Sequence, residues 1–157
     1  MISIPLSVLR TSKYYIIQAP IRAFVYFFRG TPLLVQMFII YYGFAQFEAI
    51  KTSFVWYFFK EAWFCALFAF TLNTAAYTTE IIRGAIEATT HGEVEAAKAA
   101  GMSRLLMLRR IVLPSAFRRA LPQYSNEIIF MLHGSSLASV ITIVDITGAA
   151  RIINSRF

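Results

Sequence analysis

The chain has 157 residues, of which 58% are hydrophobic, 16% aromatic and only 15% charged. A soluble domain is about 45–50% apolar and about 25% charged, so this charge is too small to cover a soluble surface of this size. The composition therefore excludes an ordinary soluble domain and favours a chain that faces lipid. The net charge of +7 would otherwise favour nucleic acid as a partner. Here the basic residues lie between apolar stretches, which indicates the loops of a membrane protein.

Two apolar segments of different kinds follow the N-terminus. Residues 14–28 contain an arginine and a proline, so we expect an interfacial or re-entrant helix there and not a full membrane crossing. Residues 30–47 carry no charge, and their length is near the roughly 20 residues that cross a bilayer core. Thr31 fits an N-cap and Pro32 fits the first helical turn. This second segment is therefore predicted to be a spanning helix.

A second uncharged segment, residues 62–79, has small and polar residues along one helical face. These residues recur at steps of three and four and are Ala62, Ala66, Ala69, Asn73, Ala76 and Glu80. In lipid, a stripe of small side chains lets helix backbones approach closely, and its polar members face protein or a water-filled path. We therefore predict a helix that packs inward through this stripe.

A third apolar segment, from about residue 120 to 144, is long enough to cross a membrane but is polar for lipid. Five of its residues share one helical face, namely Gln123, Asn126, Phe130, His133 and Leu137. Such a helix buries that face in a bundle or lines a pathway. Pro122 predicts a local break or kink near its start.

Basic residues alternate along the chain in a way that predicts the topology. Those before residue 30 are Arg10, Lys13, Arg22 and Arg29, whereas only Lys51 and Lys60 separate the first two uncharged segments. Those between the second and third segments are Arg83, Lys98, Arg104, Arg109, Arg110, Arg118 and Arg119. Cytoplasmic loops carry the excess of lysine and arginine. Residues 83–119 are therefore predicted to lie inside the cell.

This cytoplasmic segment is predicted to form a compact helical hairpin. Thr90 and the glutamate three residues later match a capping box, which starts an alanine-rich helix over about Val94–Ala100. Gly101 occupies the position of a left-handed C-cap. Ser103 restarts a helix, which Pro114 kinks or ends. The shape alone fits a plain interfacial hairpin and a docking element equally well.

The hairpin carries a spaced pattern: Glu95-Ala96-Ala97, three residues, Gly101, nine residues, Ile111-Val112-Leu113-Pro114. The pattern resembles the signature loop of the membrane subunits of bacterial ABC importers, and every fixed position is filled. In that family the loop is the cytoplasmic foot on which an ATPase subunit pushes. The resemblance implies that Glu95, Ala96, Ala97 and Gly101 contact the ATPase.

The resemblance covers nearly the whole chain. The stretches Arg29–Gln36 and Leu72–Ile81 look like those of polar amino acid permeases, and Met131-Leu132-His133 resembles the branch that imports histidine and other basic amino acids or opines. The implied fold is an all-α integral membrane bundle with a cytoplasmic coupling helix, the type I ABC importer permease fold. We expect one partial transmembrane domain over residues 1–157, truncated at both ends, with its coupling loop at about 83–119.

The function that the resemblance implies is amino acid import, of histidine, arginine, lysine, ornithine or opines, as a multi-pass permease subunit of the bacterial inner membrane. The implied partners are ABC ATPase subunits, a second permease subunit, identical or homologous, a periplasmic amino acid-binding protein and the lipid bilayer. No nucleic acid partner is expected. The sequence has no glycine-rich phosphate loop with an adjoining lysine. ATP hydrolysis is therefore expected on a partner, with no cofactor on this chain.

Polar residues within the apolar segments are candidates for the substrate path, because burying them in lipid is unfavourable. Glu127 is suited to pair with a cationic amine of the substrate, and Asn126 and Asn73 are suited to hydrogen-bond an amino or carboxylate group. The alternative is that Asn73, Glu80 and Glu127 pair with polar groups or arginines on neighbouring helices.

Other chemistries receive little support from the sequence. His91 and His133 fall in different compartments of the predicted topology, so no metal site is expected. No nucleophile–base pair supports catalysis, so the chain is not expected to be an enzyme. The alternative function is a non-transporting membrane anchor or assembly protein whose basic hairpin recruits a soluble partner. Polar stripes on two predicted spans favour transport over that alternative.

Overall fold

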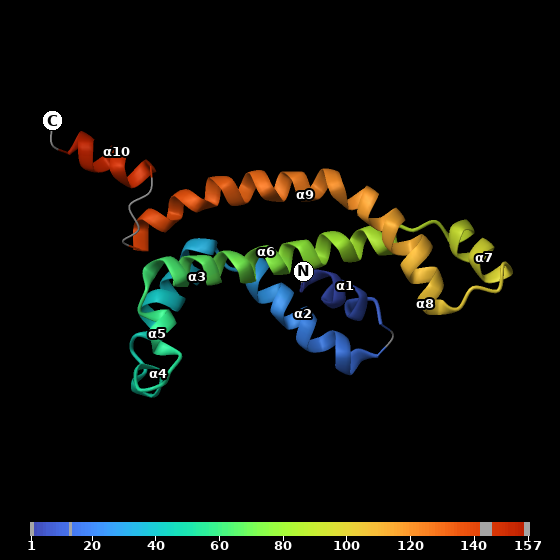
Figure 1. The fold of residues 1–157 in the computed structure, drawn as a ribbon, viewed down its shortest axis with the longest axis horizontal. Coiled ribbons are helices and arrows are strands. Elements are labelled where there is room, and N and C mark those ends of the chain that lie inside the picture. The colour runs from blue at the N-terminus through green and yellow to red at the C-terminus, as the bar shows by residue number, and fades with distance from the viewer. Residues whose placement is uncertain (1, 13, 142–145, 156–157) are drawn as a thin grey trace. The chain divides into compact units, whose positions relative to one another are not determined.

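The computed structural model describes residues 2–12, 14–141 and 146–155, and these residues form helices and turns with no strand among them (Figure 1). The chain folds into two compact units. The first comprises Met1–Val25 and Ala75–Glu127, and the second comprises Tyr26–Thr74 and Ile128–Phe157. Lys13 and residues 142–144, which the sequence analysis placed in a basic segment and in the third apolar segment, lie outside the described residues. The prediction of one domain over 1–157 stays a prediction.

The elements in chain order are α1 (Ser3–Arg10), α2 (Tyr15–Gly30), α3 (Leu33–Phe38), η1 (Ile39–Gly43), α4 (Glu48–Lys51), α5 (Trp56–Phe59), α6 (Ala62–Glu87), α7 (His91–Ala99), α8 (Arg104–Met107), η2 (Leu108–Val112), α9 (Leu113–Ser135), η3 (Ser136–Ile141) and α10 (Ile146–Asn154). Elements η1 and η2 are π-helical turns, and η3 is a 3₁₀ helix. The expectation of an all-helical chain is confirmed over these residues.

The first uncharged segment is shorter as a helix than the sequence analysis predicts. Helix α3 begins at Leu33 and passes into η1, which ends at Gly43. Pro32 takes the N-cap position in an extended conformation, with ψ of 137°. The prediction of Thr31 as N-cap and of one spanning helix over residues 30–47 is therefore wrong. A proline disfavours the helical conformation in the residue before it, so α2 ends ahead of Thr31.

The apolar helices were compared with the length and hydropathy that a membrane crossing requires. Within the described part of the chain, no single helix is both long and apolar enough to cross on its own. Helices α2 and α3 with η1 meet the requirement together, as Tyr15–Gly30 and Leu33–Gly43, with a bend of 106° between them. Such a bent pair is either a broken span or a re-entrant loop.

Helix α6 confirms the second predicted helix and its inward face. Four residues of the predicted stripe are buried, namely Ala66, Ala69, Asn73 and Ala76, whereas Leu67 on the opposite side is exposed. In the second unit, Ala66 and Ala69 pack in a core with Met37 and Ile40. The small stripe is therefore the packing face of the helix.

Helix α9 runs without interruption through Pro122, so of the break or kink predicted at that proline, the break is absent and the kink stays a prediction. The predicted polar face, which includes Asn126, Phe130 and His133, is exposed in this chain. The buried face of α9 instead carries Ala116, Ala120 and Glu127. Ala116 and Ala120 pack against Ile81 and Ala85 of α6 in the core of the first unit.

The packing of α6 gives a first prediction. Ala69→Leu is expected to destabilise the protein by about 1–3 kcal/mol, because added methyl groups in a filled core force its neighbours apart and Ala69 has no exposed surface. Thr71→Leu places the same side chain on the exposed side of α6 and is expected to change stability by less than about 0.5 kcal/mol. Thermal unfolding of both variants measures the difference, and equal melting temperatures would contradict the prediction.

Candidate functional site

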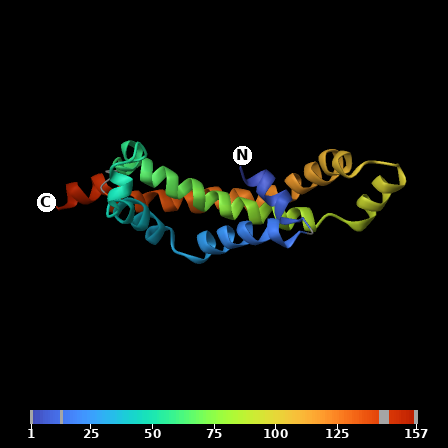
Figure 2. The same ribbon diagram turned by 90° about the horizontal axis from the view of Figure 1, so that it is seen from below.

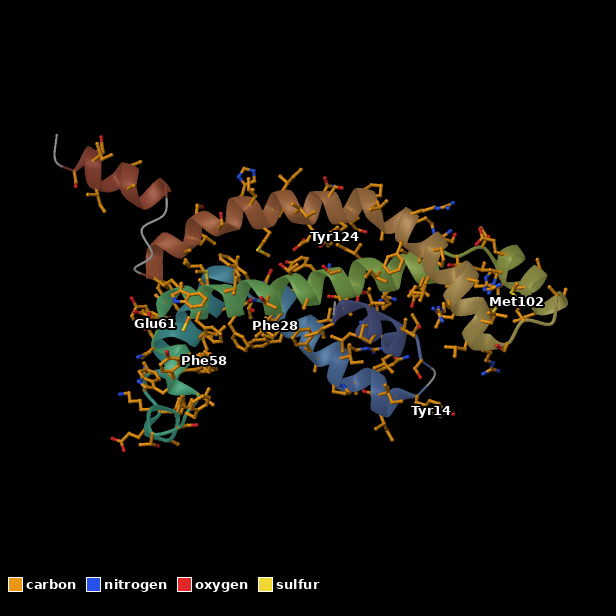
Figure 3. All side chains as sticks on the ribbon, in the orientation of Figure 1. Tyr14, Phe28, Phe58, Glu61, Met102 and Tyr124 are labelled. Atoms are coloured by element: carbon orange, nitrogen blue, oxygen red, sulfur yellow. The ribbon has the colours of Figure 1, made fainter. Side chains whose placement is uncertain are left out.

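The predicted hairpin is formed by α7 and α8 and extends beyond the end of α6 (Figures 1 and 2). Its turn is a Schellman motif. Gly101 has φ of +71°, its N–H donates to the Lys98 carbonyl at 2.9 Å, and the Met102 N–H donates to the Ala97 carbonyl at 3.1 Å. Met102 is labelled at this turn in Figure 3. The predicted left-handed cap at Gly101 is therefore confirmed.

The start of α7 departs from the predicted capping box. Thr90 occupies the N-cap position, but among the described residues its side chain makes no cap hydrogen bond. The Glu93 side chain reaches across to α9, where its Oε2 accepts a hydrogen bond from Ser115 Oγ at 3.3 Å. A tertiary partner has thus replaced the local one. The predicted position of the cap is right and its side-chain bonding is wrong.

A second polar contact fastens the root of the hairpin to α9. Arg119 Nη2 donates to Thr89 Oγ1 at 2.8 Å. Thr89 lies just after α6, and Arg119 lies in α9, so this bond joins the two ends of the segment from which the hairpin emerges. Together with the contact between Glu93 and Ser115, it ties the foot to the helix that follows it.

The second limb of the hairpin begins as predicted and ends differently. Ser103 is the N-cap of α8, and its hydroxyl accepts from the Leu106 N–H at 3.4 Å. The chain then winds through the π-helical turn η2 directly before Pro114 and continues as α9. Pro114 has no N–H to donate to the helical turn before it, and that turn is the π-helical η2. The proline therefore changes the winding ahead of it but does not end the helical path.

The four residues predicted to contact an ATPase differ in exposure. Glu95, Ala96 and Gly101 are exposed, whereas Ala97 is only 3% exposed and supplies the carbonyl that accepts from Met102. Three of the four residues thus present a surface to another molecule. The Ala97 side chain packs inside the hairpin.

The three residues predicted for the substrate path lie in different surroundings. Asn73 is buried in the second unit, where its Nδ2 donates to the Phe28 carbonyl at 3.2 Å and to Gln36 Oε1 at 3.1 Å. Asn126 is exposed, and Glu127 beside it on α9 is 8% exposed. For Asn73, these bonds favour the alternative in which it pairs with neighbouring helices.

Glu80 also follows that alternative. Its carboxylate lies 3.5 Å from Arg10 of α1 and accepts from Arg83 Nε at 2.8 Å, and Arg83 also pairs with Glu87. The hydrogen bond that Arg83 donates to Glu80 raises the pKa of Arg83 above its ordinary value, which keeps the guanidinium charged. The Arg10–Glu80 pair thus joins α1 to α6, and Arg83 and Glu87 extend this charged group along α6 toward the hairpin.

Gln36 is a buried polar residue that sequence reasoning missed. It is 2% exposed, and from α3 it bonds to Phe28 near the end of α2 and to Thr31 in the connection between the two helices. A polar residue four positions after Pro32 in an uncharged run is the signal that could have indicated it. No group of three or more histidine, cysteine, aspartate and glutamate side chains in the described part of the chain is arranged to hold a metal ion.

The fold of this chain is shared by a solved structure. A crystal structure described as an amino acid ABC transporter with histidines matches 98% of this chain and 68% of its own, with a TM-score of 0.84 and 33% sequence identity. Residues 3–155 match the family described as binding-protein-dependent transport system inner membrane component. The chain belongs to this family.

Named relatives cover nearly all of this chain. The nopaline transport system permease protein of Agrobacterium fabrum is 51% identical over 96% of this chain and 63% of that protein. The octopine transport system permease protein of Rhizobium radiobacter is 50% identical over 97% and 62%. The histidine/lysine/arginine/ornithine transport system permease protein of Escherichia coli is 50% identical over 96% and 63%. The chain thus spans less than two thirds of the length of each of these relatives.

The Schellman turn gives a second prediction. Gly101→Ala is expected to destabilise the hairpin by about 1 kcal/mol, because a Cβ disfavours the left-handed conformation. Gly92→Ala within α7 is expected to stabilise it by about 0.5 kcal/mol, because alanine loses less backbone freedom than glycine in a helix. An added Cβ meets no atom within 4 Å at either position, so the two changes differ only in backbone conformation. Hydrogen exchange of the hairpin amides measures both, and equal protection would contradict the prediction.

Proposed function

We propose that this chain is a permease subunit of an ABC importer for basic amino acids or opines, and that it crosses the inner membrane several times. The observation that carries the proposal is the signature hairpin, which exposes Glu95, Ala96 and Gly101 in a chain of this transport family. Relatives named for opines and for histidine, lysine, arginine and ornithine support the substrate class. They also favour transport over the anchor alternative.

An ATPase partner is the natural occupant of the exposed hairpin surface. In this proposal the partner hydrolyses ATP and this chain does no chemistry of its own. Closure of two ATPase subunits displaces α7. The turn at Gly101 and two hydrogen bonds carry this displacement into the rest of the first unit. One bond joins Glu93 to Ser115 of α9, and the other joins Arg119 of α9 to Thr89. The ion pair between Glu80 and Arg10 links α6 to α1.

A second permease subunit is supported by the exposed polar face of α9. Gln123, Asn126 and His133 are exposed in this chain, and polar side chains are unfavourable against lipid tails. A protein partner or a water-filled path satisfies them. We place the second subunit, identical or homologous, against this face, and a periplasmic binding protein delivers the amino acid. Asn126 and Glu127 are the proposed substrate contacts.

The ATPase contact gives a third prediction. Ala96→Arg is expected to abolish co-purification of the cognate ATPase subunit from membranes, because a long charged side chain blocks a close-fitting exposed surface. Ala49→Arg makes the same change at an exposed alanine of α4, which lies outside the hairpin, and is expected to retain the ATPase. Loss of the ATPase from both variants, or from neither, would count against the hairpin as the docking site.

Substrate recognition gives a fourth prediction. Glu127→Gln is expected to raise the KM for arginine uptake by about tenfold, because a charge-assisted hydrogen bond becomes a neutral one. Glu61→Gln makes the same chemical change at an exposed carboxylate and is expected to leave the KM unchanged. Uptake of radiolabelled arginine by proteoliposomes containing the whole transport complex measures both. An unchanged KM in the Glu127 variant would remove this residue from the substrate path.

A further inference from the structure

The bend between α2 and α3 leaves backbone carbonyl groups that need hydrogen-bond partners. The last carbonyl groups of a helix have no partner within the helix, and the chain turns by 106° after α2 instead of continuing. In a membrane interior such groups are tolerated only where other parts of the protein satisfy them. The Phe27 carbonyl accepts from the Thr31 N–H at 3.1 Å and from the Thr31 hydroxyl at 2.8 Å. The Phe28 and Thr31 carbonyls also need partners.

The Gln36 side chain, on α3, supplies hydrogen-bond donors to these carbonyls. Its Nε2 lies 2.8 Å from the Phe28 carbonyl, 2.9 Å from the Thr31 carbonyl and 2.8 Å from Thr31 Oγ1. One amide group therefore contacts the end of α2 and the connecting residue at once. Because the amide belongs to α3 and the Phe28 carbonyl belongs to α2, opening the bend would separate the two groups.

The Asn73 side chain completes the arrangement from α6. Its Nδ2 donates to the same Phe28 carbonyl and to Gln36 Oε1. Phe28, labelled in Figure 3, is thus held by two amides from two different helices. Gln36 and Asn73 are 2% and 6% exposed, so water cannot readily replace either bond. Unmade hydrogen bonds are most unfavourable in such surroundings.

Apolar packing holds the same corner from the α3 side. Met37, next to Gln36, has no exposed surface and packs with Ala66 and Ala69 of α6. Within the second unit, α9 also approaches α3 closely, since a Cβ added at Gly134 would lie 3.1 Å from Leu33 Cδ2. The amides and this packing favour one angle between α2 and α3.

We propose that Gln36 and Asn73 are positioning residues that lock the bend between α2 and α3, and that Asn73 holds this bend and does not bind substrate. The lock makes the bend a fixed corner of the membrane-embedded protein and not a hinge. The part of the proposal that concerns transport rests on the proposed function. The part that concerns the bend does not.

The bend is tested by distance measurements between two spin labels in the whole complex in lipid nanodiscs. The labels are attached at Tyr26→Cys and Tyr42→Cys, which replace side chains that are 81% and 47% exposed on α2 and η1, in a Cys65→Ala background. With the lock intact, one narrow distance distribution is expected. Asn73→Ala and Gln36→Met each leave buried acceptors unsatisfied, which shifts an equilibrium by on the order of fivefold or more, so a second distance population is expected.

Thr71→Ala is the matched control, because the Thr71 hydroxyl bonds the Leu67 carbonyl of its own helix and lies on the exposed side of α6. Its distance distribution is expected to equal that of the parent. A single unchanged distance in both Asn73→Ala and Gln36→Met overturns the lock. If Asn73→Ala is not recovered from membranes, Gln36→Met, which keeps the buried volume, decides the question alone.

Transport kinetics separate positioning from substrate binding. Asn73→Ala is expected to lower the maximal rate of arginine uptake at least threefold with the KM unchanged, because the site retains its ligands while fewer molecules hold the working geometry. A raised KM with an unchanged maximal rate would make Asn73 a substrate ligand and overturn the proposal. If the parent complex transports no amino acid, the proposed function fails, whereas the distance measurement still decides whether the lock exists.

Discussion

Two side-chain amides that meet one backbone carbonyl hold the second unit in its observed form. Gln36 and Asn73 both donate to the carbonyl of Phe28, and the sharp turn after α2 depends on them. A membrane protein has no solvent inside the bilayer to bond a helix end that stops early. A helix can therefore break only where side chains donate hydrogen bonds to its end in place of water. The alanines of α6 bring Asn73 close enough to do so, since the stripe that contains it is the packing face of that helix.

Sequence reasoning succeeded where a local rule determines the geometry. The alternation of small residues on α6 predicted its buried face, because a face of alanines permits close approach whatever the partner. Gly101 predicted the left-handed turn of the hairpin, because a side chain is disfavoured in that conformation. The spaced pattern around Glu95 indicated the family, which the match over residues 3–155 confirms.

The failures arose where the outcome depended on more than a local sequence pattern. The capping box at Thr90 failed because Glu93 bonds Ser115 of α9, a partner that no local pattern reveals. Residues 30–47 read as one span because they carry no charge, whereas the helical path there runs only from Leu33 to Gly43. The substrate contact predicted for Asn73 stays a prediction, against which we propose a positioning role. Polarity in an apolar helix shows that a partner exists but not whether that partner is a ligand or a backbone.

The continuity of the second limb of the hairpin has a mechanical consequence. From Arg104 to Glu127 the first unit contains no loop residue, since α8, η2 and α9 follow one another directly. At the rise of an α-helix, the length along this helical path is about 36 Å. A push applied near Arg104 cannot be absorbed by a slack connection before it reaches Glu127. The only change of winding along this path is the π turn before Pro114. Any bending of the path under load is therefore concentrated within these five residues.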